Sequence, residues 1–196
     1  MSVSLVKVTQ GNKVDLTKTN PGITRFRAGL GWRPNTSSSS SQFDLDVTAF
    51  VLDANDKVLS EDYMVFYNNL KDPAGFLVHS GDNRDGVGDG DDESIVIDIA
   101  RAPLNAVRIA IVVTIDDAVS RSQNFGMVRD SYIKIYNDTT GEALLEYELG
   151  ENASGEIAMR FADIYLKDGQ WKFDAVGTGQ SGGLATYVRE FGLEPA

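Results

Sequence analysis

Short runs of alternating apolar and polar residues, separated by turn residues, recur along almost the whole chain and constrain its fold more than any other feature. Residues 42–53 show the pattern clearly, and residues 107–115 form a nearly continuous apolar run, as expected for a central strand covered on both faces. The pair Asp168-Gly169 separates two further runs and is a strong signal for a β-hairpin.

Further strands are expected at residues 2–7 and 13–18, around a Gly11-Asn12 turn, and at residues 63–69. Short helices are expected near residues 118–124, capped by Asp116-Asp117, and near residues 184–191. About ten short strands with so few helices predict an all-β protein, an antiparallel β-sandwich.

The segment from His79 to Glu93 interrupts this rhythm with a dense group of acids. Six carboxylates and one arginine lie between Asp82 and Glu93, and glycines separate several of them. Two like charges about 4 Å apart repel by roughly 4 kcal/mol at an effective dielectric constant near 20, so a tight acidic loop needs a positive partner. Glycine lets the backbone fold tightly, and a calcium ion takes about six to eight oxygen ligands. The segment therefore predicts a calcium site, with a solvated acidic loop as the alternative.

The known calcium and phosphate motifs do not describe this segment. An EF-hand loop that began at Asp85 would have Val96 at its last position, where a glutamate belongs. The Gly-x-Gly-Asp-Gly-Asp rhythm of a calcium-binding β-helix occurs once, whereas a solenoid needs several copies. A phosphate-binding glycine loop would need a lysine that the segment lacks.

The composition restricts the functions open to the chain. With 196 residues, 42% of them hydrophobic, the chain is expected to form a single domain over residues 1–196. The net charge of -11 disfavours nucleic acid as a partner, and no apolar run is long enough for direct membrane insertion. The sequence has no Cys, which excludes disulfides and thiol chemistry. These features predict a soluble, cytoplasmic protein.

One segment matches a serine-nucleophile motif. Gly179-Gln-Ser-Gly-Gly183 fits the pattern Gly-x-Ser-x-Gly and lies between an expected strand and an expected helix. The α/β-hydrolase order needs a histidine after the serine, but the one histidine, His79, precedes Ser181, so we favour a structural turn. We expect His79 itself to be a structural residue at the end of a strand, because one histidine makes no zinc site.

Asp44 and Asp46 alternate with apolar residues and therefore share the opposite face of the expected strand over residues 42–53. They are either ordinary solvent-facing residues or calcium ligands that a rigid strand holds in place. In the second interpretation, the amide oxygens of Asn68 and Asn69, at the end of another expected strand, complete the site. Spacing alone does not separate the two interpretations.

These features together resemble the TerD family of tellurium-resistance and stress-response proteins over nearly the whole chain. The motifs that carry the resemblance are Ser2-Val-Ser-Leu5, Gly29-Leu-Gly-Trp32, Phe43-Asp-Leu-Asp46, Phe66-Tyr-Asn-Asn69, the 79–93 segment, Gln123-Asn-Phe-Gly-Met127, Trp171-Lys-Phe173 and Gly182-Gly-Leu184. The resemblance implies a β-sandwich that binds calcium, with enough oxygens for two adjacent ions, and that is not an enzyme. The calcium ligands that it implies are Asp82, Asn83, Asp89, Asp91, Asp92 and Glu93 in the acidic segment, and Asp44, Asp46, Asn68 and Asn69 outside it.

We therefore expect a non-enzymatic calcium-binding protein of a tellurite-resistance and general stress-response system, whose partners are other proteins of that system. The alternative is a calcium-dependent module that recognises lipids or glycans, with Phe76 and Val87 as apolar tips beside the loop. Any link to tellurium oxyanions rests on the resemblance alone, because the chain has no thiol and its acidic surface repels anions.

Overall fold

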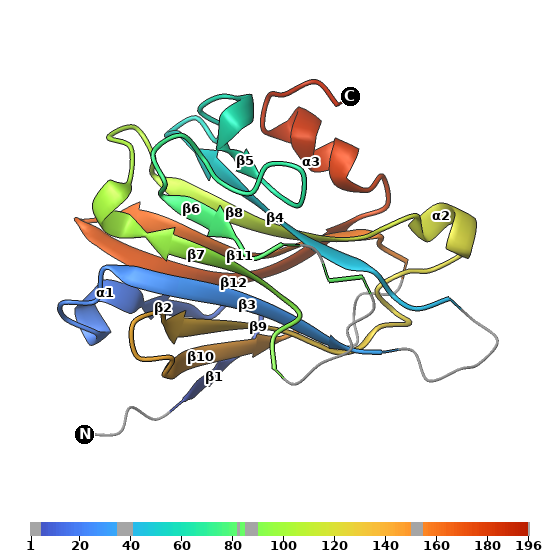
Figure 1. Ribbon diagram of the computed structural model, residues 1–196, viewed down its shortest axis with the longest axis horizontal. Helices are drawn as coiled ribbons and strands as arrows, with labels where there is room; N and C mark the ends of the chain where they lie inside the picture. Colours follow the sequence, from blue (N-terminus) through green and yellow to red (C-terminus); the bar gives the residue numbers. More distant parts are fainter. Residues whose placement is uncertain (1–4, 35–40, 82, 85–89, 150–154, 196) are drawn as a thin grey trace.

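The computed structural model describes residues 5–34, 41–81, 83–84, 90–149 and 155–195, which fold into two stacked β-sheets (Figure 1). Each sheet has six strands within these residues, in the order β1-β10-β9-β3-β7-β6 in sheet A and β2-β12-β11-β8-β4-β5 in sheet B. Neighbouring strands are antiparallel, except that β1 runs parallel to β10. The antiparallel β-sandwich expected from the sequence is confirmed.

The strands of sheet A are β1 (Val6–Val8), β3 (Arg25–Arg33), β6 (Leu77–His79), β7 (Glu93–Asp98), β9 (Arg129–Asn137) and β10 (Ala143–Glu148). The strands of sheet B are β2 (Lys13–Asp15), β4 (Leu45–Leu52), β5 (Met64–Val65), β8 (Arg108–Ile115), β11 (Ala158–Lys167) and β12 (Gln170–Gln180). The helices are α1 (Leu16–Thr19), α2 (Ala118–Arg121) and α3 (Leu184–Glu190), with 3-10 turns η1 (Glu61–Tyr63) and η2 (Ile99–Arg101). Within the described residues, no helix has the length and apolar character needed to cross a membrane.

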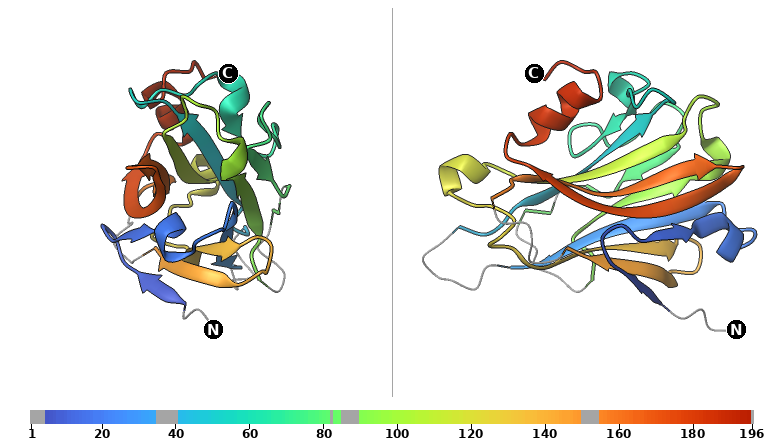
Figure 2. Two further views of the ribbon diagram at one scale, coloured as in Figure 1. Left: turned by 90° about the vertical axis from the view of Figure 1, so that its left-hand side faces the viewer. Right: turned by 180° about the vertical axis from the view of Figure 1, so that it is seen from behind.

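Two apolar layers stabilise the fold, because sheet B is covered on both faces. The main core lies between the sheets and takes alternate side chains from each strand, such as Phe26 and Leu30 of β3. A smaller core lies on the other face of sheet B, where Tyr187 and Phe191 pack against Phe50. This explains why β8 is apolar almost throughout, as the sequence predicted. In both views of Figure 2, α3 and β1 lie on opposite sides of the molecule.

The N-terminal part differs from the sequence-based expectation of two strands around the Gly11-Asn12 turn. Residues 13–18 begin as β2 but continue as α1, because the Asp15 carboxylate accepts the N–H of Lys18 at 3.0 Å and caps a helical turn. The two strands also do not pair with each other. β1 joins sheet A and β2 joins sheet B, so the turn between them passes from one layer to the other.

Two further expected elements are shorter in the structure. Residues 63–69 were expected as one strand, but β5 has two residues and a tight turn follows, in which Phe66 and Asn69 exchange backbone hydrogen bonds of 3.0 Å. The helix expected near residues 118–124 ends at Arg121, since Ser122 takes a left-handed conformation with φ of 53°. The helix expected near residues 184–191 is confirmed as α3.

Candidate metal centre

Two buried side chains, His79 and Glu93, connect sheet A to β4 at the two ends of the acidic segment. Glu93 Oε2 accepts the N–H of Val47 at 2.8 Å, and His79 Nε2 lies 3.2 Å from the Val47 carbonyl oxygen. His79 Nδ1 accepts the N–H of Gly81 at 3.0 Å, so the proton of the neutral ring lies on Nε2 and is donated to that carbonyl. Because β5 pairs with β4 only further along the strand, these side chains provide the hydrogen bonds that a longer β5 would have given. The structural role expected for His79 is confirmed.

Asn83, Asp92 and Glu93 lie close together, and the carboxylate oxygens of Asp92 and Glu93 form hydrogen bonds with other groups of the protein. The second carboxylate oxygen of Glu93 accepts the N–H of Asn83 at 3.2 Å. One oxygen of Asp92 accepts the N–H of Trp32 at 3.0 Å, and the other lies 3.4 Å from the side-chain nitrogen of Asn83. These bonds fix the segment where it joins β7 and β3.

Asp91 points to the outer face of sheet A, into a group of residues that we call the Asp91 cradle: the donors Arg27, Tyr132 and Tyr136, and Gly29, which leaves room for the carboxylate. Its carboxylate accepts hydrogen bonds from Arg27 Nη1 at 2.7 Å, from the Tyr136 hydroxyl at 2.9 Å and from the Tyr132 hydroxyl at 3.2 Å. Gly29 allows this approach, because a Cβ atom at that position would collide with the carboxylate. The Asp91 side chain is therefore only 7% exposed.

The two phenols of the cradle are held in their protonated form. Burial, followed by the negative charge of Asp91, raises the pKa of Tyr132. Burial, followed by the hydrogen bond to Asp91, raises the pKa of Tyr136, whose ring also packs 4.1 Å from the guanidinium of Arg27. Both hydroxyls therefore remain hydrogen-bond donors to Asp91 at neutral pH.

The side chains of Asp91, Asp92 and Glu93 therefore point in three different directions. Asp91 faces outward, Asp92 bonds to the edge of β3, and Glu93 faces the space between the sheets. Within the described part of the chain, no three Asp, Glu or His side chains come close enough to hold one metal ion. Asp82 and Asp89, the other expected ligands of this segment, lie outside the described residues.

A second group of acids lines a small cavity of about 80 Å³ at the start of β4. Its lining residues, which we call the acidic cavity, are Asp44, Asp46, Tyr67, Arg84 and Asp116. The Asp44 side chain is only 6% exposed, and its Oδ2 atom lies 3.7 Å from Nε of Arg84. The donor set is all oxygen and rich in carboxylate, which is the chemistry that calcium prefers. Two arginines already lie beside these acids: Arg84 is 3.7 Å from Asp44, and Arg121 Nη2 is 3.4 Å from Asp116 Oδ2. Asp44 and Asp46 are buried and share this cavity, so they are the candidate ligands here, although the described residues do not bring three acids together around one point.

Sequence reasoning did not single out Asp116 for this cavity, because the Asp116-Asp117 pair looked like the cap of the following helix. Strand register brings it there. Leu45 of β4 pairs with Ile115 of β8, and one step further the N–H of Asp116 bonds to the carbonyl of Asp44 at 2.8 Å. Asp117 makes no side-chain cap. The available signal was that an acid directly precedes β4 and another directly follows β8, but this signal becomes informative only once the pairing of the two strands is known.

Asn68 and Asn69 are not among the residues that line the acidic cavity; Tyr67 is. The side-chain nitrogen of Asn69 donates to the carbonyls of Met64 at 2.8 Å and Asp62 at 3.1 Å, which closes the turn after β5. The structure thus gives Asn69 a role in shaping the loop that carries Tyr67. Ligation by either asparagine stays a prediction.

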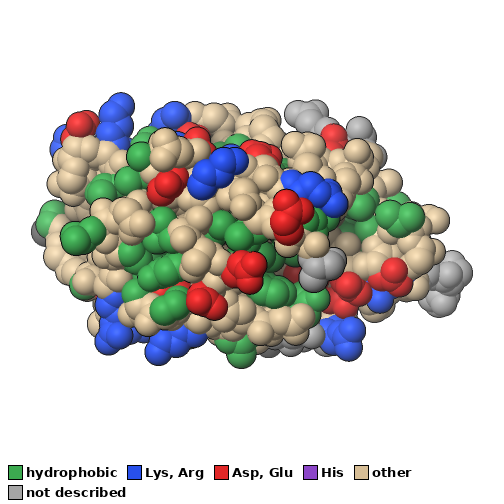
Figure 3. Space-filling view, turned by 90° about the horizontal axis from the view of Figure 1, so that it is seen from above, with side chains coloured by type: hydrophobic (Ala, Val, Ile, Leu, Met, Phe, Trp, Pro, Cys, Tyr) green, Lys and Arg blue, Asp and Glu red, His purple; other side chains and the backbone are tan. Residues whose placement is uncertain are grey.

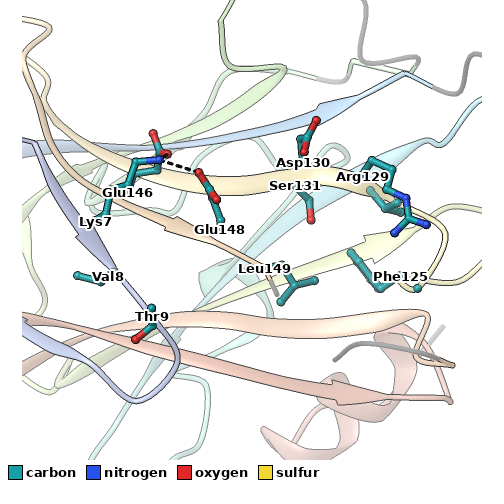
Figure 4. A pocket seen from close by; sticks show the side chains of 12 residues that line it. Lys7, Val8, Thr9, Phe125, Arg129, Asp130, Ser131, Glu146, Glu148 and Leu149 are labelled. Atoms are coloured by element: carbon teal, nitrogen blue, oxygen red, sulfur yellow. Dashed lines mark hydrogen bonds and ion pairs between the residues drawn. The ribbon is translucent and has the colours of Figure 1, made fainter. Parts of the chain in front are cut away.

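A larger cavity of about 410 Å³ lies between β1, β9, β10 and the segment before β9 (Figure 4). At one end, Lys7 Nζ lies 2.9 Å from Glu148 and 3.1 Å from Glu146, so the charges there compensate one another. At the other end, Arg129 lies beside the apolar side chains of Phe125 and Leu149 (Figure 4). We assign the candidate site to the acidic cavity instead, because it contains Asp44 and Asp46, two of the expected ligands.

The serine motif lies between a strand and a helix, as expected, but the histidine that a serine nucleophile would need lies elsewhere. Ser181 lies in the exposed turn between β12 and α3. Both ring nitrogens of His79 are engaged, by Val47 and Gly81, inside the sandwich. The one imidazole of the chain therefore does not serve Ser181 as a base.

Comparison with known proteins points to one family. The model of the TerD domain matches residues 1–191. The chain is 46% identical over 193 residues to the tellurium resistance protein TerD of an Alcaligenes species, a match that covers 98% of each protein. It is 45% identical over 194 residues to general stress protein 16U of Bacillus subtilis strain 168, covering 99% of each. A crystal structure of a TerD homologue from Streptomyces coelicolor A3(2) shares the fold, with a TM-score of 0.71 at 21% identity over 89% of this chain and 100% of the other.

Proposed function

Because the chain belongs to the TerD domain family, we propose that it is a non-enzymatic calcium-binding protein of a tellurium-resistance and stress-response system. In this proposal, it presents a calcium-dependent surface to other proteins of the same system. The names of its relatives support the part about resistance and stress. The acidic cavity supports the part about calcium.

The single observation that carries the calcium proposal is the burial of Asp44 and Asp46 in one cavity with Asp116. Asp44 and Asp46 would each contribute a carboxylate to the ion, and the further ligands expected at Asp82 and Asp89 stay predictions. Bound calcium would supply two positive charges beside these two buried carboxylates. The chain's own contribution is rigidity, since β4 and β8 fix the backbones of all three acids through their pairing.

One face of the molecule has a surface that favours a protein partner (Figure 3). Hydrophobic side chains occupy the middle of the face seen from above, with acidic ones among them, while lysines and arginines are dispersed (Figure 3). Tyr67, which lines the acidic cavity, is itself an exposed aromatic side chain. An exposed apolar and acidic surface suits docking of another protein. Partial neutralisation of the acids by a cation would strengthen such docking.

Calcium-dependent recognition of lipids or glycans receives less support. Of its two expected apolar tips, Phe76 is fully buried and packs 5.8 Å from Trp171 in the core. The expectation for Phe76 was therefore wrong, because the residue packs in the core directly before β6. Val87 lies outside the described residues.

The proposed contribution to tellurium resistance is indirect. The chain has no Cys to bind or reduce tellurium, and its net charge of -11 repels oxyanions. Ser181 lacks an imidazole base, as described above. The cytoplasmic location expected from the sequence stays a prediction.

Calorimetric titration of EDTA-stripped protein with calcium, and separately with magnesium, tests the proposal. We expect calcium binding with Kd between about 10⁻⁹ and 10⁻⁵ M, which the Asp44→Asn/Asp46→Asn variant loses. At a calcium concentration of about 100 times Kd, the wild type should gain about 2.7 kcal/mol of stability. The variant should not gain it.

The matched control is Asp130→Asn, which removes an exposed acid paired with Arg33 away from the acidic cavity. This control should bind calcium like the wild type. No heat of binding and no calcium-dependent change in Tm in the wild type would overturn the calcium part of the proposal.

A further inference from the structure

The cavity of about 410 Å³ between β1, β9, β10 and the segment before β9 takes no part in the proposed calcium function. Its apolar wall belongs to the main core, because Val8, Phe125 and Val128 are buried members of the cluster between the sheets. Leu149 is partly buried against the same cluster. The cavity thus brings the edge of the core within reach of a ligand, and its volume lies in the range of about 300–1,000 Å³ that is typical of small-molecule sites.

A tight turn holds Phe125 and Val128 in this wall. The N–H of Met127 donates to the carbonyl of Asn124 at 3.0 Å, and the N–H of Val128 donates to the carbonyl of Phe125 at 3.2 Å. The N–H of Phe125 is itself bonded to the carbonyl of Glu156 at 2.9 Å. On the other side, β1 is fixed by its pairing with β10. The walls of the cavity are therefore preformed.

The three acids that line the cavity already have basic partners. Asp130 forms an ion pair with Arg33. Lys7 Nζ lies 3.1 Å from Glu146 and 2.9 Å from Glu148. The charge of Lys7 is engaged by the same two contacts, so this end of the cavity attracts neither a cation nor an anion strongly.

Arg129 is the other basic residue of the lining, and it begins β9 at an exposed position. Among the residues that the structure describes, no acidic side chain forms an ion pair with it. It lies beside Phe125 and Leu149 (Figure 4). The cavity therefore offers one unpaired positive charge next to an apolar wall.

We propose that this cavity binds a small monocarboxylate with an aliphatic chain. The carboxylate pairs with Arg129, whose planar guanidinium suits two parallel hydrogen bonds to a carboxylate. The chain lies along Val8, Val128 and Leu149, where each CH₂ group that leaves water adds to the affinity. One carboxylate is enough, because Lys7 is already engaged. This inference does not depend on calcium binding.

The net charge of the protein does not prevent such binding. A charge of -11 opposes an anion at long range. At an ionic strength of about 0.15 M, however, exposed charges more than about 8 Å apart are largely screened from one another. The charges that line the cavity therefore determine the affinity, and the acids among them have basic partners.

NMR titration of isotope-labelled protein with octanoate tests the inference, at an ionic strength of about 0.15 M and below the concentration at which octanoate forms micelles. We expect amide chemical shifts to change around residues 7–9, 125–131 and 149. Arg129→Gln should weaken binding about five- to tenfold, and Arg129→Lys should retain most of the affinity. Leu149→Ala should also weaken binding, because it removes part of the apolar wall. Octanol, which has the same chain without the charge, should bind the wild type more weakly than octanoate does.

The matched control is Arg189→Gln, which removes an exposed arginine in the last turn of α3, outside the cavity. This control should bind octanoate like the wild type, and the Tm of each variant shows whether its fold is intact. Absence of shift changes at the cavity, equal affinity of Arg129→Gln and the wild type, or equal affinity of octanoate and octanol overturns the inference. Tighter binding of a short peptide that ends in leucine also overturns it, because the occupant is then the end of a protein chain. The octanoate Kd should be the same in EDTA and in calcium, so this result and the calcium result stand or fall separately.

Discussion

The carboxylate of Asp91 lies in the most acidic part of the sequence, yet the protein surrounds it with its own donors. Arg27, Tyr132 and Tyr136 bind it on the outer face of sheet A. In the sequence, an acid next to a glycine looks the same whether its side chain binds a metal ion or anchors a loop through hydrogen bonds. The direction of its side chain depends on the register of β3 against β7, which spacing in the sequence does not reveal. The concentration of acids could be predicted at this scale, but their individual partners could not.

Replacing Asp91 by Asn should destabilise the fold by about 1–3 kcal/mol, because a nearly buried charge-assisted set of hydrogen bonds loses its charge. Urea denaturation measures this loss. Asp130→Asn, at an exposed ion pair, should stay within about 0.5 kcal/mol of the wild type. We expect the calcium Kd of Asp91→Asn to equal that of the wild type. A tenfold weaker Kd would show instead that Asp91 is a ligand.

Among the secondary structure elements, local patterns were predictable and long-range pairings were not. The hairpin between β11 and β12 turns at Asp168 and Gly169, both with positive φ, as the Asp-Gly signal predicted. The central position of β8 followed from its apolar run. In contrast, β1, β2 and β5 have two or three residues each, too few to show a period. The acidic cavity depends on how β4 pairs with β8, so Asp116 could not be assigned to it from the sequence.

The attachment of α3 to sheet B gives a prediction at the scale of secondary structure elements. The Tyr187 hydroxyl accepts the N–H of Arg160 at 2.9 Å and donates to the carbonyl of Thr178 at 3.0 Å, where the pairing of β11 is irregular. Tyr187→Phe leaves both backbone groups without this partner, so we expect a loss of about 1–3 kcal/mol in urea denaturation. Hydrogen exchange of the Arg160 amide should also accelerate. Val119→Ala, at an exposed position of α2, should change stability by less than about 0.5 kcal/mol. Equal effects of the two substitutions would contradict the prediction.

For the whole molecule, the cradle predicts how stability changes at alkaline pH. Burial first, and then Asp91, raises the pKa of both Tyr132 and Tyr136. A raised pKa in the folded state contributes stability that is complete below the ordinary tyrosine pKa of about 10 and is lost as pH rises through the folded value. Stability should therefore fall above about pH 10, and it should fall less steeply in Tyr132→Phe/Tyr136→Phe.

Urea denaturation of both proteins at about pH 8 and about pH 11 measures the two slopes. The difference between the proteins at about pH 8 gives the separate effect of the lost hydrogen bonds, which serves as the control. An equal loss of stability between the two pH values in both proteins would show that these phenols do not contribute to the loss of stability at alkaline pH.

The placement of the first two strands has a consequence for how the protein is made. Val6 of β1 pairs with Leu145, and Val14 of β2 pairs with Phe173. A ribosome adds about 5 to 20 residues per second, so these partners emerge many seconds after the strands that need them. These two strands thus leave the exit tunnel well before the strands with which they pair. During most of translation, this short stretch is open to any chaperone that binds nascent chains.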